Sequence, residues 1–102
     1  MIDMSGKTAL ITGAGRGQGK AEAELLASLG ARVFVTDVDE GAGREAAAAI
    51  GSEFLFLDVA SPEGWTNVAQ HVGQAAGGLD ILVNNAAIVH FAPIAETTPE
   101  TF

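Results

Sequence analysis

The sequence contains no cysteine, which excludes both a disulfide framework and a metal site built on thiolates. Basic residues are scarce, since 5 lysines and arginines stand against 13 aspartates and glutamates and leave a formal net charge of −8. So few cations cannot form the basic stripe that binds a nucleic-acid backbone. No apolar run approaches the roughly 20 residues that span a bilayer. We therefore expect a cytoplasmic protein with neither nucleic acid nor membrane as a partner.

Short apolar runs are present, however, and they predict β-strands at residues 8–11, 33–35, 54–57 and 81–83. Each run is continuous rather than alternating, which is typical of a parallel strand covered on both faces. Hydrophobic residues make up 48% of the 102 residues, so the chain can bury the core of one small domain.

Segments with helical periodicity separate the predicted strands. The apolar positions expected to face the core fall into three groups: Ala21, Leu25 and Leu29; Ala42, Ala46 and Ile50; Trp65, Val68, Val72 and Ala76. Gly30 and Gly51 stand where glycines end helices, and Ser61-Pro62 is typical of a helix start. The alternation predicts an α/β fold, a Rossmann-type doubly wound parallel sheet in the order βαβαβαβ with strand order 3-2-1-4.

The stretch TGAGRGQG, residues 12–19, places four glycines directly after the first predicted strand. A strand, a glycine-rich turn and a helix together aim free backbone N–H groups and the positive helix end at one point, which suits a phosphate. The common fingerprint G-x-G-x-x-G fails because Gln18 stands at its third glycine, whereas T-G-x-x-x-G-x-G fits. The residues of this stretch expected to bind a dinucleotide cofactor are Gly13, Gly15, Arg16, Gly17, Gln18 and Gly19.

This variant motif, near the N-terminus, resembles the short-chain dehydrogenase/reductase family, and the resemblance covers the whole chain. Asp37 ends the second strand in VFVTDVDE, Asp58 and Val59 end the third in FLFLDV, and Asn85 follows the fourth in DILVNNAA. The segments SGKTALITGAGRGQG and GARVFVTDVDE are most similar to hydroxysteroid and related alcohol dehydrogenases. The resemblance implies a homo-oligomeric oxidoreductase, a tetramer or dimer, that transfers hydride between NAD(H) and a small alcohol or ketone.

Asp37 bears on the choice of cofactor. It lies 24 residues beyond Gly13, close to the spacing of about 20 at which an acidic residue meets the adenosine ribose hydroxyls. A carboxylate there repels a 2′-phosphate, which favours NAD over NADP. Arg16 opposes this preference, because a basic residue before the second motif glycine occurs in NADP-preferring relatives. Asp37 carries more weight, since Val38 rather than a second basic residue follows it.

The other motifs imply further cofactor contacts. The resemblance places Asp58 and Val59 against the adenine ring. It places Asn85 against the nicotinamide ribose, beside Ala86 and Ala87, and Ala87 replaces the glycine usual in the family. Two histidines, His71 and His90, are interpreted as structural or exposed.

Catalytic residues are not predicted in this sequence. The family uses serine, tyrosine and lysine, and this chain contains no tyrosine. Its two lysines, Lys7 and Lys20, precede or lie within the phosphate region. Thr98-Pro99-Glu100 predicts a helix start that Phe102 cuts short. We therefore expect residues 1–102 to be the N-terminal part of a single dinucleotide-binding domain, inactive alone. A non-catalytic NAD(H)-binding regulatory module stays open as the alternative.

Overall fold

Strands and helices alternate along residues 2–85, the part of the chain that the computed structural model describes. The strands are β1 (Thr8–Thr12), β2 (Arg32–Asp37), β3 (Glu53–Phe56) and β4 (Ile81–Asn84). The helices are α1 (Gly17–Ser28), α2 (Glu40–Ala49) and α3 (Pro62–Ala76). All strands pair in parallel in the order β3-β2-β1-β4, which confirms the predicted Rossmann-type sheet. Among residues 2–85, no helix has the length and apolar character needed to cross a bilayer.

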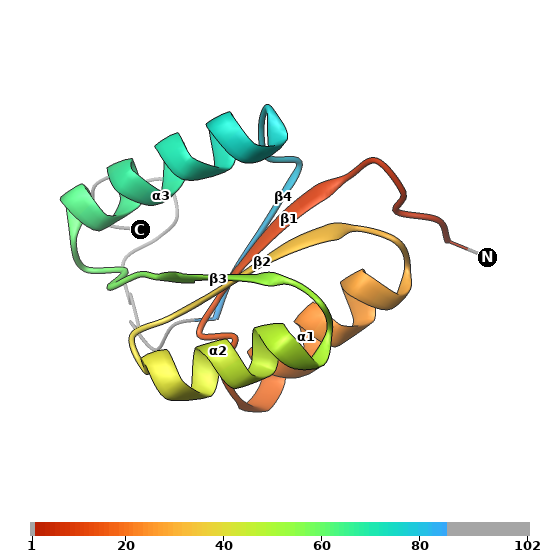
Figure 1. Cartoon of the computed structure of the whole chain (residues 1–102), viewed down its shortest axis with the longest axis horizontal. Helices are drawn as coiled ribbons and strands as arrows, with labels where there is room; N and C mark the ends of the chain where they lie inside the picture. The colour runs from red at the N-terminus through yellow and green to blue at the C-terminus, as the bar shows by residue number, and fades with distance from the viewer. Residues whose placement is uncertain (1, 86–102) are drawn as a thin grey trace, which may run out of the picture.

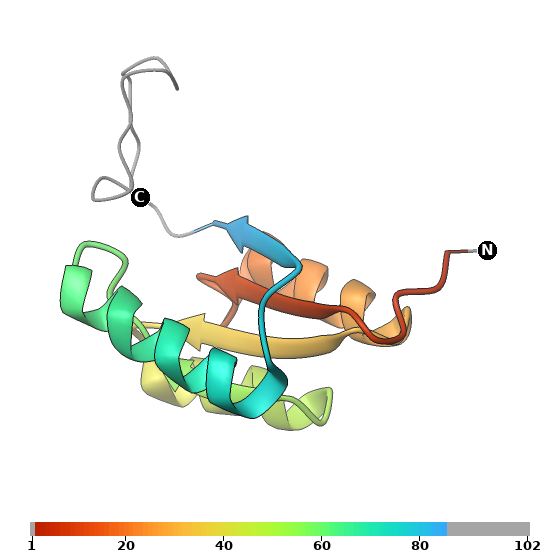
Figure 2. The ribbon, with the colours of Figure 1, turned by 90° about the horizontal axis from the view of Figure 1, so that it is seen from above.

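Helices cover both faces of the sheet, with α3 on one face and α1 and α2 on the other (Figure 1 and Figure 2). Successive residues of each central strand point to opposite faces, so β1 and β2 contribute to two separate cores. The core under α1 and α2 contains Ala9, Ile11, Ala14, Ala23, Val33, Val35, Ala46 and Ala47. The core under α3 contains Leu10, Phe34, Leu57, Val68 and Val72.

Helix α1 turns a different face to the sheet from the one predicted. Ala21 and Leu25 are exposed, Leu25 at 58%, whereas Gly19 and Ala23 are buried. A Cβ added at Gly19 would overlap the carbonyl group of Gly13, so α1 can lie this close to the end of β1 only on its small residues. The prediction was wrong because backbone approach, rather than leucine spacing, selects the buried face.

Helix boundaries follow the predicted glycines and caps. Gly30 and Gly51 adopt φ of 100° and 65°, the left-handed conformation that ends α1 and α2. The Ser61 hydroxyl oxygen accepts the N–H of Gly64 at 3.0 Å, and Pro62 begins α3, as the sequence predicts.

Side chains fix β4 to β1 at both of its ends. At the start, the N–H of Thr8 donates to the Asp80 carboxylate at 2.9 Å, and the N–H of Asp80 donates to the Thr8 carbonyl at 2.9 Å. At the far end, the Thr12 hydroxyl donates to the side-chain oxygen of Asn84 at 2.7 Å and accepts the N–H of Asn85 at 2.9 Å. These contacts set the position of Asn85 relative to the loop that follows β1.

Two glycines of α2 should respond oppositely to alanine. A Cβ at Gly43 would overlap the ring of Phe54 on β3, whereas one at Gly41 would lie 3.7 Å from Asp39 Oδ1, an ordinary contact distance. We expect Gly43→Ala to lower the free energy of unfolding by about 1–3 kcal/mol through overpacking. Gly41→Ala should raise it by about 0.4–1 kcal/mol by restricting the unfolded chain. Urea denaturation of both variants tests this, and equal shifts would contradict the packing of α2 on Phe54.

Candidate functional site

The carboxyl ends of the strands meet at one edge of the sheet, where the arrowheads of β1, β2 and β4 point the same way (Figure 2). The strand order reverses between β1 and β4, and open α/β sheets bind ligands at such a switch point. The predicted residues that lie along this edge are the glycine loop after β1, Asp37 at the end of β2, Asp58 and Val59 after β3, and Asn85 after β4.

The glycine loop is shaped by two left-handed residues. Gly13 and Gly17 have φ of 60° and 61°, a conformation that side-chain-bearing residues rarely adopt. A Cβ built on Gly17 meets nothing within 4 Å, so the space beside the start of α1 is open. A phosphate group needs this combination of bare backbone and free space.

The start of α1 differs from that of the other two helices. Arg16 occupies the N-cap position, and in the described part of the chain no side chain caps α1 and no acidic residue lies in its first turn. Helices α2 and α3 begin with Asp39 and Ser61 as side-chain caps, followed by Glu40 and Glu63. The first turn of α1 therefore keeps its backbone donors and its positive dipole end uncompensated by a carboxylate cap.

The carboxylate of Asp37 is held firmly beside this loop. Its Oδ2 accepts the N–H of Gly15 at 2.9 Å, and its Oδ1 accepts the N–H of Asp39 at 2.9 Å. A Cβ at Gly15 would lie 2.8 Å from Asp37 Oδ2, so this contact requires glycine. The N–H of Ala14 also donates to the Thr36 carbonyl at 3.0 Å. These hydrogen bonds join the loop to the end of β2 and place the Asp37 carboxylate at their junction.

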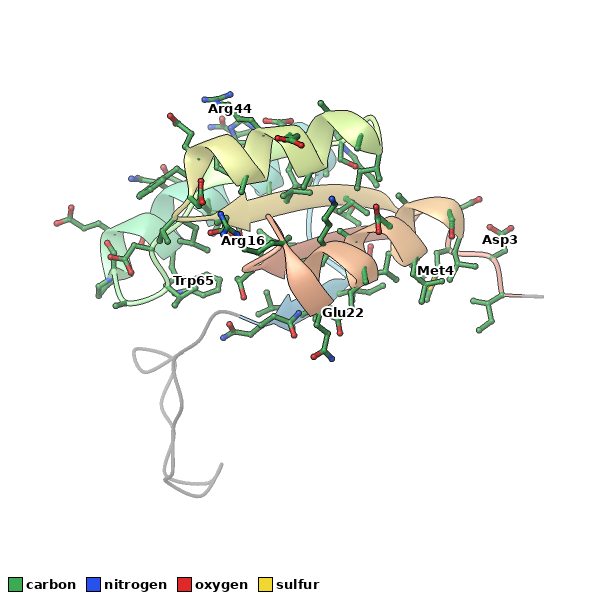
Figure 3. All side chains as sticks on the ribbon, turned by 90° about the horizontal axis from the view of Figure 1, so that it is seen from below. Asp3, Met4, Arg16, Glu22, Arg44 and Trp65 are labelled. Carbon is green, nitrogen blue, oxygen red and sulfur yellow. The ribbon has the colours of Figure 1, made fainter. Side chains whose placement is uncertain are left out.

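Arg16 forms an ion pair with Asp39 across the same junction. Figure 3 shows Arg16 at the start of α1, beside the end of β2. Both side chains are accessible to solvent, Arg16 at 73% and Asp39 at 45%. The sequence singled out Arg16 but gave no role to Asp39, although an acidic residue directly before a helical segment is a recognisable N-cap.

The loop after β3 brings Asp58 and Val59 to the same edge. The N–H of Leu57 donates to the Asp37 carbonyl at 3.3 Å, which joins the ends of β2 and β3. Asp58 Oδ1 accepts the N–H of Ala60 at 2.9 Å. The Trp65 indole N–H donates to the Val59 carbonyl at 2.9 Å. Trp65, predicted only as a core residue, therefore also anchors this loop.

Asn85 reaches toward α1 rather than along the sheet. Its side-chain N–H donates to the Glu22 carboxylate, and Figure 3 shows Glu22 on α1 beside β4. The sequence gave no indication of Glu22, because the two residues are separated by 63 positions. Ala86, Ala87 and His90, also named from the sequence, lie outside the described residues.

His71 lies away from this edge, on α3, and pairs with Glu53 at the start of β3. Its ring meets Phe34 edge-on, with the ring centroids 6.2 Å apart. These contacts agree with the structural role predicted for it. Within residues 2–85, no group of three or more potential ligands could hold a metal ion.

The family model described as short chain dehydrogenase matches residues 7–102. The chain belongs to the short-chain dehydrogenase family. The glycine loop, Asp37 and Asn85 all lie within the matched residues.

Several short-chain dehydrogenases are similar along most of the chain. Galactitol 2-dehydrogenase of Agrobacterium fabrum is 43% identical over 97% of this chain and 40% of its own length. The 3-beta-hydroxysteroid dehydrogenase of Comamonas testosteroni is 41% identical over 84% of this chain and 35% of its own. The RhlG/NADP active-site complex of Pseudomonas aeruginosa superposes with a TM-score of 0.79 at 35% identity, over 85% of this chain and 37% of that one. The chain thus spans about two fifths of these relatives' length.

Proposed function

We propose that the protein carrying this sequence is an oxidoreductase that transfers hydride between NAD(H) and a small alcohol or ketone. The observation that carries the proposal is the Asp37 carboxylate, held by two backbone N–H groups beside a glycine loop whose helix start has no side-chain cap. The dehydrogenase names of the relatives support the reaction class.

The residues present fit a dinucleotide. Open space at Gly17 and the uncapped first turn of α1 suit the phosphates, and Asp37 suits the ribose hydroxyls of the adenosine half. Asp58 and Val59 are proposed to contact the adenine, and Asn85, oriented by Glu22, the nicotinamide ribose. When bound, the nicotinamide supplies the hydride chemistry, while this chain's residues bind and orient the cofactor. The residues of the glycine loop proposed to line the cofactor site are Gly13, Gly15, Arg16, Gly17, Gln18 and Gly19.

We also propose how the sequence sits in its protein. Residues 1–102 are proposed to be the N-terminal, cofactor-binding part of a single domain in a homo-oligomeric cytoplasmic enzyme, a dimer or tetramer. The share of each relative that the chain covers, 40% for galactitol 2-dehydrogenase, supports this assignment. The domain's substrate-binding and proton-transfer residues would then be supplied by sequence beyond Phe102.

Cofactor preference is the direct test of the role of Asp37. We expect the full-length gene product to bind NADH about tenfold or more tightly than NADPH, because a fixed carboxylate repels a 2′-phosphate. Asp37→Ala should reduce this difference in affinity between NADH and NADPH. Fluorescence titration with both cofactors measures it, with Asp58→Ala as the control that should weaken both cofactors equally.

Two results would contradict the proposal in different ways. Tighter binding of NADPH would show that Arg16 outweighs Asp37 in the choice of cofactor. Binding of cofactor without turnover of any alcohol or ketone by the full-length protein would instead favour the regulatory alternative.

A further inference from the structure

We infer that Asp39 is a specificity-determining residue that disfavours NADPH by neutralising Arg16. The inference rests on the proposed dinucleotide site and deepens it. Asp37 accounts for one part of cofactor selection, by direct repulsion. Asp39 accounts for a second part, because it pairs with Arg16 at the same corner.

Asp39 is held at the junction of β2 and α2 by its backbone and by both of its carboxylate oxygens. Its backbone N–H holds Asp37 Oδ1 at 2.9 Å, and its own Oδ1 accepts the N–H of Ala42 at 3.0 Å as the cap of α2. Its Oδ2 is then left to pair with the Arg16 guanidinium. The contact with Ala42 orients the carboxylate, so Oδ2 is turned toward Arg16 while Oδ1 caps α2.

The charges at this corner explain the effect on selectivity. Arg16 follows Gly15, whose backbone N–H donates to Asp37, and its guanidinium pairs with Asp39, two residues beyond Asp37. The guanidinium and the carboxylate proposed to meet the ribose therefore both belong to the junction of the glycine loop and the end of β2. A 2′-phosphate binds best where an arginine is free to form charge-assisted hydrogen bonds with it. While Arg16 is paired with Asp39, such a phosphate would have to compete with a carboxylate for it.

Asp39→Asn separates this role from the structural ones. Asparagine caps helices as well as aspartate does, and the backbone N–H that holds Asp37 is retained, so only the negative charge is lost. Both partners are solvent-exposed, which limits the strength of the pair. We expect Asp39→Asn to tighten NADPH binding by about three- to tenfold and to change NADH binding by less than about twofold.

Glu40→Gln provides the matched control. Glu40 is the next residue along the chain, loses the same charge, and pairs with Arg44 at 3.4 Å rather than with Arg16. It should leave the ratio of NADH to NADPH affinity nearly unchanged. The gain caused by Asp39→Asn should also vanish on an Arg16→Ala background and shrink in high salt.

The titrations use the full-length gene product, and circular dichroism melts verify that each variant folds. Asp39→Ser is a second variant, which also retains a side-chain oxygen to cap α2. Three results would overturn the inference alone: an unchanged affinity ratio in Asp39→Asn, an equal gain in Glu40→Gln, or a gain that persists without Arg16. Failure of the unsubstituted protein to bind either cofactor would overturn the proposed function together with it.

Discussion

Gly17→Val is expected to reduce cofactor affinity by about a hundredfold or more. The valine side chain would enter the open space beside the first turn of α1, where we propose that the phosphates bind. A β-branched residue is also strained at the φ of 61° that Gly17 adopts, so some loss of stability accompanies the loss of binding. Calorimetric titration with NADH, together with thermal unfolding, measures both effects.

Gly51→Val is the control that separates the effect of backbone strain from the effect of filling the proposed phosphate site. Gly51 has a nearly identical φ of 65°, and a Cβ there likewise meets nothing within 4 Å, but it follows α2 at the opposite edge of the sheet. Both variants should lose stability to a similar extent, about 1–3 kcal/mol. Only Gly17→Val should lose the cofactor. Retained affinity in that variant would remove the phosphate-binding interpretation of the loop.

The 102-residue chain, produced alone, is expected to show no detectable hydride transfer. It contains no tyrosine, the residue that the family resemblance assigns as the base. General acid–base catalysis contributes about 10² to 10⁴ in rate, and correct positioning of the substrate contributes more. Absorbance of NADH at saturating cofactor, with secondary alcohols, ketones and hydroxysteroids as substrates, measures turnover.

The full-length gene product assayed in parallel is the control for these substrates. Cofactor binding by the shorter chain should be measured separately, so that lost binding is not mistaken for lost chemistry. We also expect the shorter chain to self-associate, because Leu82 on the edge strand β4 is 50% exposed. Clear turnover by the 102 residues alone would show that the proton-transfer groups are already present in them.

The strand order and most helix boundaries could be predicted from local patterns. Continuous apolar runs identified the four strands, and Gly30, Gly51 and Ser61-Pro62 marked helix ends that the structure confirms. The buried face of α1 could not be predicted in this way. Apolar residues lie on several sides of that helix, and its orientation depends on the contact of Gly19 with Gly13, which no periodicity encodes.

At the candidate site too, features set by local sequence could be predicted and contacts between distant segments could not. Gly17 and Asp37 were recognisable because their spacing reflects the ligand that they are proposed to bind. Their supports were not recognisable, since Glu22 contacts Asn85, and Asp39 contacts Arg16, only after distant segments meet. Contacts of this kind depend on the folded arrangement of α1, β2 and β4, and patterns in a single sequence do not predict them.

The side-chain contacts at the two ends of β4, Asp80 with Thr8 and Asn84 with Thr12, bear on how this strand finds its register during folding. Among the described residues, β4 is four residues long and pairs only with β1, so few backbone hydrogen bonds set its register. A slip by one residue would turn each side chain to the opposite face of the sheet. It would also separate Asp80 from Thr8 and Asn84 from Thr12 at the same time. The side-chain contacts at the two ends of β4 therefore both favour the observed register over one shifted by a residue.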